Sequence, residues 1–333
     1  MSTITLIPGD GIGPEITDAV MRILTSAGAE LQVDIQHAGL TTFTETGELI
    51  PRSLIESIEK HRIALKGPLT TPVGKGFRSV NVQLRQIFDL YQNIRPVMTM
   101  PGIPSRYQDV DLVLFRENTE GMYSGFEIYD QRNQIADAIA RISREGSERI
   151  IRSAFEFAQQ NGRSSVTIIH KANIMKQSSG LFLEVGRKVA QEFPDILAND
   201  RIVDNMCMQL VMYPERYDVL VTTNLFGDIL SDLCAGLVGG LGLVPGANIG
   251  DTVSIFEAVH GSAPDIAGRD IANPTAMLQS ALMLLRHIGQ QDVAEKIYQA
   301  LLMTVSEKRC TTRDIGGNAS TSEFASHVIS NLP

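Results

Sequence analysis

Short runs of β-branched and apolar residues recur along this chain of 333 residues, and they constrain its fold more than any other feature. Four of them, at residues 4–7, 111–115, 166–170 and 218–222, are each followed by a helix-like segment. Such alternation indicates an α/β protein with a substantial parallel sheet. Ligands of these sheets gather where strands end and loops lead into helices. Chemistry is therefore expected just after the four runs.

The charge balance argues against nucleic acid or a membrane surface as a partner. Lys and Arg number 29 and Asp and Glu 38, which gives a formal charge of −9 and disfavours binding to nucleic acid or anionic lipid. The most apolar stretch, residues 276–288, is too short to span a bilayer and predicts a core helix. Three cysteines without C-x-x-C spacing fit buried, reduced thiols. With no secretory pattern at the N-terminus, these features lead us to expect a cytoplasmic protein.

A glycine-rich turn at residues 9–15, GDGIGPE, follows the first run. The dinucleotide-binding fingerprint requires glycine at its first, third and sixth positions, and the sixth position here is Pro14. The segment therefore predicts a tight turn into a helix that begins with proline, and not a Rossmann phosphate loop.

Several cationic and polar side chains follow predicted elements. Ser79 and Asn81 stand at an expected helix start, and Arg85 lies on the same helix face as Asn81. Such donors at a helix start suit a carboxylate, although a helix cap followed by a solvated arginine is the alternative. With Arg95, Arg116 and Lys171, Arg85 would form a cationic pocket; each of these residues alone is equally consistent with pairing to a nearby acid. The negative net charge is screened over about 8 Å, so a local cluster would dominate.

Two acids four residues apart, Asp228 and Asp232, stand at the expected start of another helix. Both carboxylates would point the same way, as divalent-cation ligands do, but acids in a first helical turn also simply complement the helix dipole. Asp204 is a possible third ligand. Burial of Lys171 after its strand would lower its pKa toward use as a base, and Tyr123, in a polar loop, is a possible proton donor; both are equally consistent with structural roles.

Taken in order, the segments GDGIGPE, KGPLTTPVG, RSVNVQLRQ, RENTEGMYSG, HKANIMK, TTNLFGDILSD and EAVHGSAPDIAG resemble the β-decarboxylating dehydrogenases of isocitrate and isopropylmalate nearly end to end. The Ser79-x-Asn81 pair resembles the isocitrate enzymes, in which these side chains meet the γ-carboxylate. The reaction implied is oxidative decarboxylation of isocitrate to 2-oxoglutarate and CO2. The alternatives are a related enzyme for homoisocitrate or tartrate, or a noncatalytic regulatory subunit.

The resemblance also implies residue roles. Arg85, Arg95 and Arg116 correspond to the substrate carboxylate clamp, Tyr123 to the acid that protonates the enolate, and Lys171 to the residue linked to deprotonation of the hydroxyl. Asp204, Asp228 and Asp232 correspond to ligands of Mg²⁺ or Mn²⁺. The neighbouring subunit of a homodimer would supply Lys171 and Asp204, so a monomer is expected to be inactive.

NAD⁺ is the expected cofactor. Family members that use NADP⁺ carry Lys and Tyr where Asp265 and Ile266 stand, and the Asp265 carboxylate would accept hydrogen bonds from ribose hydroxyls but repel a 2′-phosphate. The remaining residues expected around the cofactor are Thr70, Thr71, Glu257, His260, Gly261 and Asn273.

The family fold is α/β with a mixed sheet and is not a Rossmann fold. Residues 1–90 and 239–333 would form the large cofactor-binding domain, and residues 91–120 and 144–238 a smaller domain with the metal ligands and dimer contacts. Residues 121–143 would form a clasp-like arm between subunits.

Overall fold

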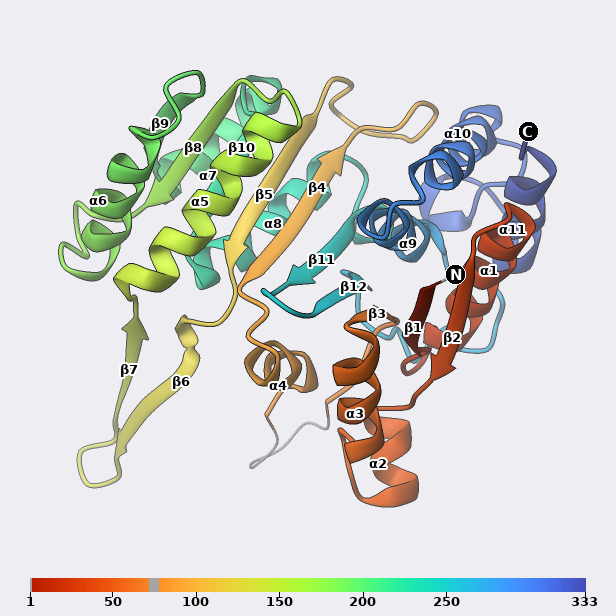
Figure 1. Cartoon of the computed structure of the whole chain (residues 1–333), viewed down its shortest axis with the longest axis horizontal. Coiled ribbons are helices and arrows are strands. Elements are labelled where there is room, and N and C mark those ends of the chain that lie inside the picture. The colour runs from red at the N-terminus through yellow and green to blue at the C-terminus, as the bar shows by residue number, and fades with distance from the viewer. Residues whose placement is uncertain (1, 72–77) are drawn as a thin grey trace.

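The structure, a computed structural model, describes residues 2–71 and 78–333, so residues 72–74 of the predicted KGPLTTPVG motif lie outside the described residues. Most strands join one mixed sheet, in the order β2-β1-β3-β12-β11-β4-β5-β10-β8-β9 (Figure 1). Their bounds are β1 (Ser2–Ile7), β2 (Leu31–Ile35), β3 (Ile63–Lys66), β4 (Gln92–Met98), β5 (Asp111–Glu117), β8 (Ser165–His170), β9 (Leu197–Ile202), β10 (Val219–Thr222), β11 (Pro245–Ile249) and β12 (Ser254–Ala258).

All four predicted runs are strands of this sheet, as β1, β5, β8 and β10. The helices are α1 (Gly13–Ser26), α2 (Leu40–Thr46), α3 (Arg52–His61), α4 (Val80–Ile87), α5 (Arg144–Gln160), α6 (Ser178–Ala190), α7 (Val203–Met212), α8 (Asn224–Leu237), α9 (Thr275–His287), α10 (Gln291–Glu307) and α11 (Thr321–Ser330). Short 3-10 turns occupy Pro214–Arg216, Leu241–Leu243 and Arg313–Ile315. The apolar stretch at residues 276–288 is the buried helix α9, and no helix in the described ranges is long and apolar enough to cross a membrane.

The sheet is parallel at both ends and antiparallel in the middle. β11 runs antiparallel to β12 and β4, and β4 runs antiparallel to β5. The mixed sheet confirms the expected fold class. The boundary between β11 and β4 also separates the strands of the predicted large domain from those of the smaller one, and the division into two domains stays a prediction.

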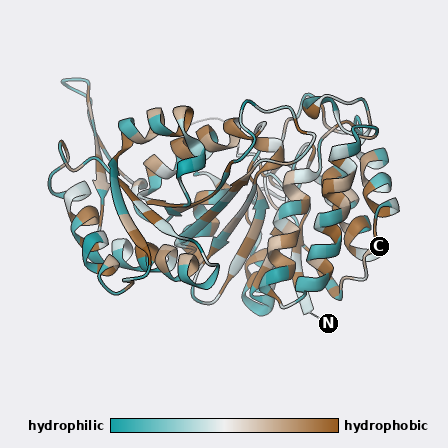
Figure 2. Ribbon diagram, turned by 90° about the horizontal axis from the view of Figure 1, so that it is seen from above, coloured by the Kyte–Doolittle hydropathy of each residue, from teal (hydrophilic) through white to brown (hydrophobic). Residues whose placement is uncertain are grey.

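Both faces of the half of the sheet that contains β4, β5, β10, β8 and β9 are covered by helices. Alternate side chains of each strand point to opposite faces, so each strand contributes to the core on both sides. On β5, Val113 and Phe115 join the core beneath α5, whereas Leu112 and Leu114 join the core beneath α8. Seen from above, helices lie on both sides of the sheet (Figure 2). Because both faces of these strands are buried, their sequences are nearly continuous apolar runs.

One expectation about the order of elements is wrong. The run at residues 111–115 leads not into a helix but into a hairpin, β6 (Gly121–Asp130) and β7 (Ile135–Arg141), which precedes α5. The hairpin projects from the body of the molecule (Figure 1), and Ile128 and Tyr129 are exposed on it. Its place matches the predicted arm at residues 121–143, and its contact with a second subunit stays a prediction.

Substitution of Leu220, which is fully buried on β10, is expected to destabilise the fold. Leu220→Ala would lower the free energy of unfolding by about 2–5 kcal/mol, because it leaves a cavity in a closely packed core. The control is Leu197→Ala, since Leu197 on the edge strand β9 is 63 % exposed. Denaturant titration of both variants is the measurement, and equal losses would contradict the proposed location of the core.

Candidate active site

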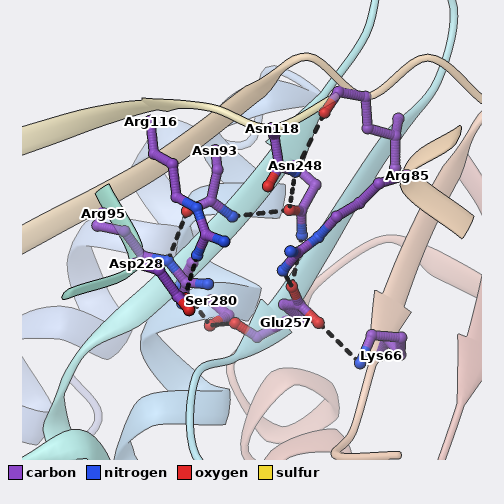
Figure 3. A network of polar contacts seen from close by, with 12 residues as sticks. Lys66, Arg85, Asn93, Arg95, Arg116, Asn118, Asp228, Asn248, Glu257 and Ser280 are labelled. Carbon is purple, nitrogen blue, oxygen red and sulfur yellow. Dashed lines mark hydrogen bonds and ion pairs between the residues drawn. The ribbon is translucent and has the colours of Figure 1, made fainter. Parts of the chain in front are cut away.

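A buried carboxylate, Glu257 on β12, lies at the centre of the polar network shown in Figure 3. Its Oε2 is 2.7 Å from Nζ of Lys66 at the end of β3. Its Oε1 accepts a hydrogen bond from Nδ2 of Asn248 at 2.6 Å and faces the Arg85 guanidinium at 3.4 Å. Although burial opposes the shift, the charges of Lys66, Arg85 and Arg95 hold the pKa of Glu257 well below its usual range.

Helix α4 presents Asn81 and Arg85 to a small cavity beside Glu257. Within the described chain, Oδ1 of Asn81 and Nε of Arg85 are buried without a hydrogen-bond partner, which is unusual for buried polar atoms and leaves both free to bind a ligand. The Arg85 side chain is only 11 % exposed, so the alternative of a solvated arginine is wrong. Ser79 stands exposed just before the helix, where its side chain makes no cap hydrogen bond.

Two further arginines are buried next to Arg85. Arg95 on β4 donates from Nε to Oδ1 of Asn93 at 2.8 Å, and burial, opposed by Glu257, lowers its pKa to about 10. Arg116 on β5 donates from Nε and Nη2 to Oδ1 of Asn224 at 2.9 and 2.8 Å. Arg85 and Arg95 therefore lie next to Glu257, and Arg116 lies next to both arginines and pairs with Asp228. The three arginines gather as the sequence predicted, but Lys171, the fourth member of the predicted pocket, pairs with Asp204 instead.

The two acids of α8 lie against this cationic cluster. Asp228 accepts hydrogen bonds from Nη1 of Arg116 and from the hydroxyl of Tyr123. Burial opposes a decrease in the Asp228 pKa, but Arg116 and Tyr123 lower it, whereas burial and the charge of Asp228 raise the pKa of Asp232. Asp228 is the fifth residue of the helix and the first turn holds no acid. The alternative that these acids complement the helix dipole from the first turn is therefore wrong.

Tyr123 lies in strand β6 and not in a loop, contrary to the sequence prediction. Its ring centroid is 5.2 Å from Cζ of Arg116. Burial, together with the hydrogen bond to Asp228, raises the pKa of the Tyr123 hydroxyl. At neutral pH the hydroxyl therefore keeps its proton and points at Asp228.

Lys171 and Asp204 form a separate pair. Nζ of Lys171 is 2.6 Å from Oδ1 of Asp204, and the Lys171 side chain is 25 % exposed. The premise that Lys171 is buried is therefore wrong, because it follows its strand at a turn and meets an acid there. Across the described ranges, no three His, Cys, Asp or Glu side chains gather as a metal site, so Asp204 does not join Asp228 and Asp232 within one chain.

A second, mostly apolar pocket lies between the segment at 260–273 and the turn at 313–314. Four residues predicted to contact the cofactor line it, namely His260, Gly261, Ile266 and Asn273. Burial lowers the pKa of His260, and its Nε2 has no hydrogen-bond partner in the part of the chain that the structure describes. Asn273 donates from Nδ2 to Asp314 at 2.8 Å. A mostly apolar pocket with a few polar atoms is typical of a binding site for a small ligand or cofactor.

The other residues expected around the cofactor are not among those that line this pocket. The Thr70 hydroxyl is 2.5 Å from that of Ser262, and Thr71 accepts a hydrogen bond from the first amide of α4 at 3.1 Å. Asp265 is exposed beside the pocket. Glu257 belongs to the cationic cluster and does not line this pocket.

The glycine-rich turn before α1 is packed against protein. Gly11, at a φ of +60°, lies so close to Ser262 that a Cβ would collide with the Ser262 carbonyl. The Asp10 carboxylate accepts hydrogen bonds from the amides of Leu40, Thr41 and Thr70 at 3.0, 2.9 and 2.8 Å. The glycines thus allow two loops to approach the turn, and the predicted tight turn into a helix with proline in its first turn is confirmed.

Several residues of these sites were not singled out from the sequence. Lys66, Asn93, Asn224 and Asn248 orient the charged cluster, and Arg313 and Asp314 line the apolar pocket. Of these, only Asn224 carried a signal, because it lies one helical turn before Asp228. Cys234 is buried as expected, but Cys207 and Cys310 are partly exposed.

Together these contacts give the α/β fold a cationic cluster suited to a small anion and a separate, mostly apolar pocket. The family follows from comparison with known proteins: residues 3–328 match the model described as isocitrate/isopropylmalate dehydrogenase, and the chain belongs to this family. A solved structure of isocitrate dehydrogenase from Methylococcus capsulatus superposes with a TM-score of 0.97 at 51 % identity, covering 100 % of this chain and 99 % of the other.

Curated relatives are similarly close. Isocitrate dehydrogenase (NAD) catalytic subunit 5 of Arabidopsis thaliana is 47 % identical over 99 % of this chain and 88 % of its own. A protein of Dictyostelium discoideum named as a regulatory subunit of the same enzyme is 49 % identical over 99 % and 91 %, and the human alpha subunit is 49 % identical over 98 % and 90 %. All three names add "mitochondrial", and the cytoplasmic location expected for this chain stays a prediction.

Removal of the central anion is expected to destabilise the protein. Glu257→Gln would cost about 3–5 kcal/mol at pH 7, because the buried cations lose their counter-charge. Glu257 has a depressed pKa, so its contribution is complete above its unfolded pKa of about 4.3 and declines as the pH falls through the folded value. The difference between variant and wild type should therefore shrink below about pH 4.3.

The matched control is Glu56→Gln on the surface of α3, where Glu56 pairs with Arg52 at 2.7 Å. This change should cost less than about 1 kcal/mol. Denaturant unfolding across pH is the measurement, and equal costs at the two positions would show that Glu257 does not neutralise the cluster.

Proposed function

We propose that this chain catalyses the oxidative decarboxylation of isocitrate to 2-oxoglutarate and CO2 with reduction of NAD⁺. The observation that supports this most directly is the gathering of Arg85 of α4, Arg95 of β4 and Arg116 of β5, together with Asn81, which α4 also carries. Isocitrate carries three carboxylates, and charge-assisted hydrogen bonds from guanidinium groups are worth about 1.5–3 kcal/mol each. Ser79 and Asn81 would meet the γ-carboxylate.

A divalent cation fits the acids of α8. Asp228 and Asp232 are oxygen ligands on successive turns of one helix, and each carboxylate oxygen of Asp228 keeps a lone pair beyond its hydrogen bond. When bound, Mg²⁺ or Mn²⁺ would supply Lewis acidity at the substrate hydroxyl and carbonyl oxygen. Asp204 would complete the ligand set from the neighbouring subunit.

Two residues of the chain would move protons. The Lys171 amine would take part in removing the hydroxyl proton, and the Tyr123 hydroxyl would protonate the carbon from which CO2 departs. The raised pKa of Tyr123 suits a donor that must hold its proton until late in the reaction. Arg116 touches both Asp228 and the Tyr123 ring, so it would orient the donor and the acid ligand together.

The apolar pocket fits NAD⁺, which would accept a hydride from the carbon that bears the hydroxyl. Nε2 of His260, which has no hydrogen-bond partner among the described residues, and the side chains of Ile266 and Asn273 suit a base with polar edges. Asp265, exposed at the pocket, would accept hydrogen bonds from the adenosine ribose and repel a 2′-phosphate. We therefore infer a preference for NAD⁺.

A regulatory role is the second candidate, because one relative, 49 % identical to this chain, is named as a regulatory subunit. The retention of every cationic, acidic and tyrosine side chain expected for chemistry favours catalysis. Since Lys171 pairs with Asp204 apart from the other cluster, the active unit is inferred to be a homodimer with shared sites.

Steady-state kinetics would test the proposed reaction. Isocitrate with NAD⁺ and Mg²⁺ should give the highest kcat/KM, ahead of NADP⁺ and ahead of homoisocitrate or isopropylmalate. Removal of divalent cations with a chelator should abolish turnover, and their addition should restore it. The substrate assignment fails if homoisocitrate is preferred, and metal dependence fails if the chelated enzyme is fully active.

Mixed dimers would test the shared site. Lys171→Met and Asp228→Asn should each be inactive alone, but co-expression should restore about a quarter of wild-type activity, because half of randomly formed dimers are hybrids with one intact site. The matched control pairs Asp228→Asn with Asp232→Asn, which lie on the same helix and should not complement. Absence of any recovery in the first mixture would exclude sharing.

A further inference from the structure

The backbone of Lys171 is held by hydrogen bonds on both sides of its peptide unit. Its N–H donates to the Ser179 hydroxyl at 2.7 Å. Its carbonyl accepts from the amides of Ile174 and Met175 at 3.1 and 2.9 Å. The next amide, of Ala172, donates to Nδ1 of the His170 ring at 3.1 Å. A partly exposed side chain therefore projects from a fixed turn between β8 and α6.

His170 contributes to this turn through one tautomer of its ring. Because Nδ1 accepts from Ala172, the proton of the neutral ring is on Nε2, which faces Oδ1 of Asp200 at 3.2 Å. Asp200 is held in turn by Arg187, whose Nη2 lies 3.0 Å from Oδ2. His170 is 6 % exposed, so water does not replace either contact readily. Asp200 thus keeps the Nδ1 lone pair available for the turn.

We propose that His170 is a positioning residue for Lys171, acting as an acceptor that fixes the Ala172 amide. The inference rests on the proposed role of Lys171 in the reaction. In the proposed dimer Lys171 would reach a site formed largely by another chain. Its amine pairs with Asp204, whose side chain is 69 % exposed, and the turn sets the point from which the lysine side chain leaves the backbone. A misplacement of about 1 Å at a reacting group costs roughly 100-fold in rate.

If His170 has a purely structural role, that role is its contact with Asp200. Two near-isosteric variants distinguish this role from the positioning of Lys171. Asparagine carries an oxygen close to the position of Nδ1 and lacks a group at Nε2. Glutamine carries an amide close to Nε2 and lacks the acceptor at Nδ1. His170→Asn therefore keeps the Ala172 hydrogen bond and loses Asp200, whereas His170→Gln does the reverse.

The experiment compares the two variants as full-length enzyme with isocitrate, NAD⁺ and Mg²⁺. His170→Asn should retain kcat within about 10-fold of wild type, and His170→Gln should lose about 100-fold with little change in KM for isocitrate. Amide hydrogen exchange of the peptide over residues 171–176 should quicken only in His170→Gln, because only that variant leaves the Ala172 amide unpaired. This second readout requires no activity.

The proposal is overturned if the two variants lose kcat equally, or if His170→Asn loses more, since either result assigns the effect to Asp200. It is also overturned if exchange over residues 171–176 is unchanged in His170→Gln. Failure of the proposed function would look different, because the wild-type protein itself would not turn over isocitrate. The positioning of the turn would then be decided by the exchange data alone.

Discussion

The site depends on the buried carboxylate of Glu257. Its ion pairs with Lys66 at 2.7 Å and with Arg85 at 3.4 Å hold three secondary structure elements together, namely β3, α4 and β12. Without this anion, the guanidinium groups of Arg85 and Arg95 would face each other in a poorly solvated region, and burial already lowers the pKa of Arg95. One internal negative charge thus allows a protein with a net charge of −9 to keep a concentrated positive site.

The topology places this cluster at the centre of the sheet. The antiparallel strands β4 and β11 join the two halves, and Asn93 and Asn248 on them are hydrogen-bonded at 2.7 Å. The acids of α8 and Tyr123 of β6 approach the cluster from one side, and the apolar pocket is formed by segments beyond β12. Lys171 and Asp204 stay apart from all of these. The cationic cluster could bind an anion within one chain, whereas the proposed chemistry would draw Lys171 and Asp204 from a second copy.

Part of the fold and part of the candidate site could be predicted from the sequence, because the patterns that indicate them lie within short segments. Apolar runs marked the strands, and helical spacing placed Asn81 with Arg85 and Asp228 with Asp232. The rest depends on contacts between distant segments, as between Lys66 and Glu257, or between Asp10 and Thr70. Such contacts cannot be predicted from a local sequence pattern. The apolar run at residues 111–115 was expected to lead into a helix, but the β6–β7 hairpin follows it, and Tyr123 lies in a strand and not in a loop. An arm at residues 121–143 was expected from the family resemblance and not from a local pattern.

A crystal structure of the protein with isocitrate and Mg²⁺ bound would test the central claim most directly. The account predicts that the substrate carboxylates contact Arg85, Arg95 and Arg116, and that the metal contacts Asp228. It also predicts that the lysine reaching the substrate hydroxyl is Lys171 of a second chain. Isocitrate bound away from the three arginines, or a complete site formed by a single chain, would contradict it.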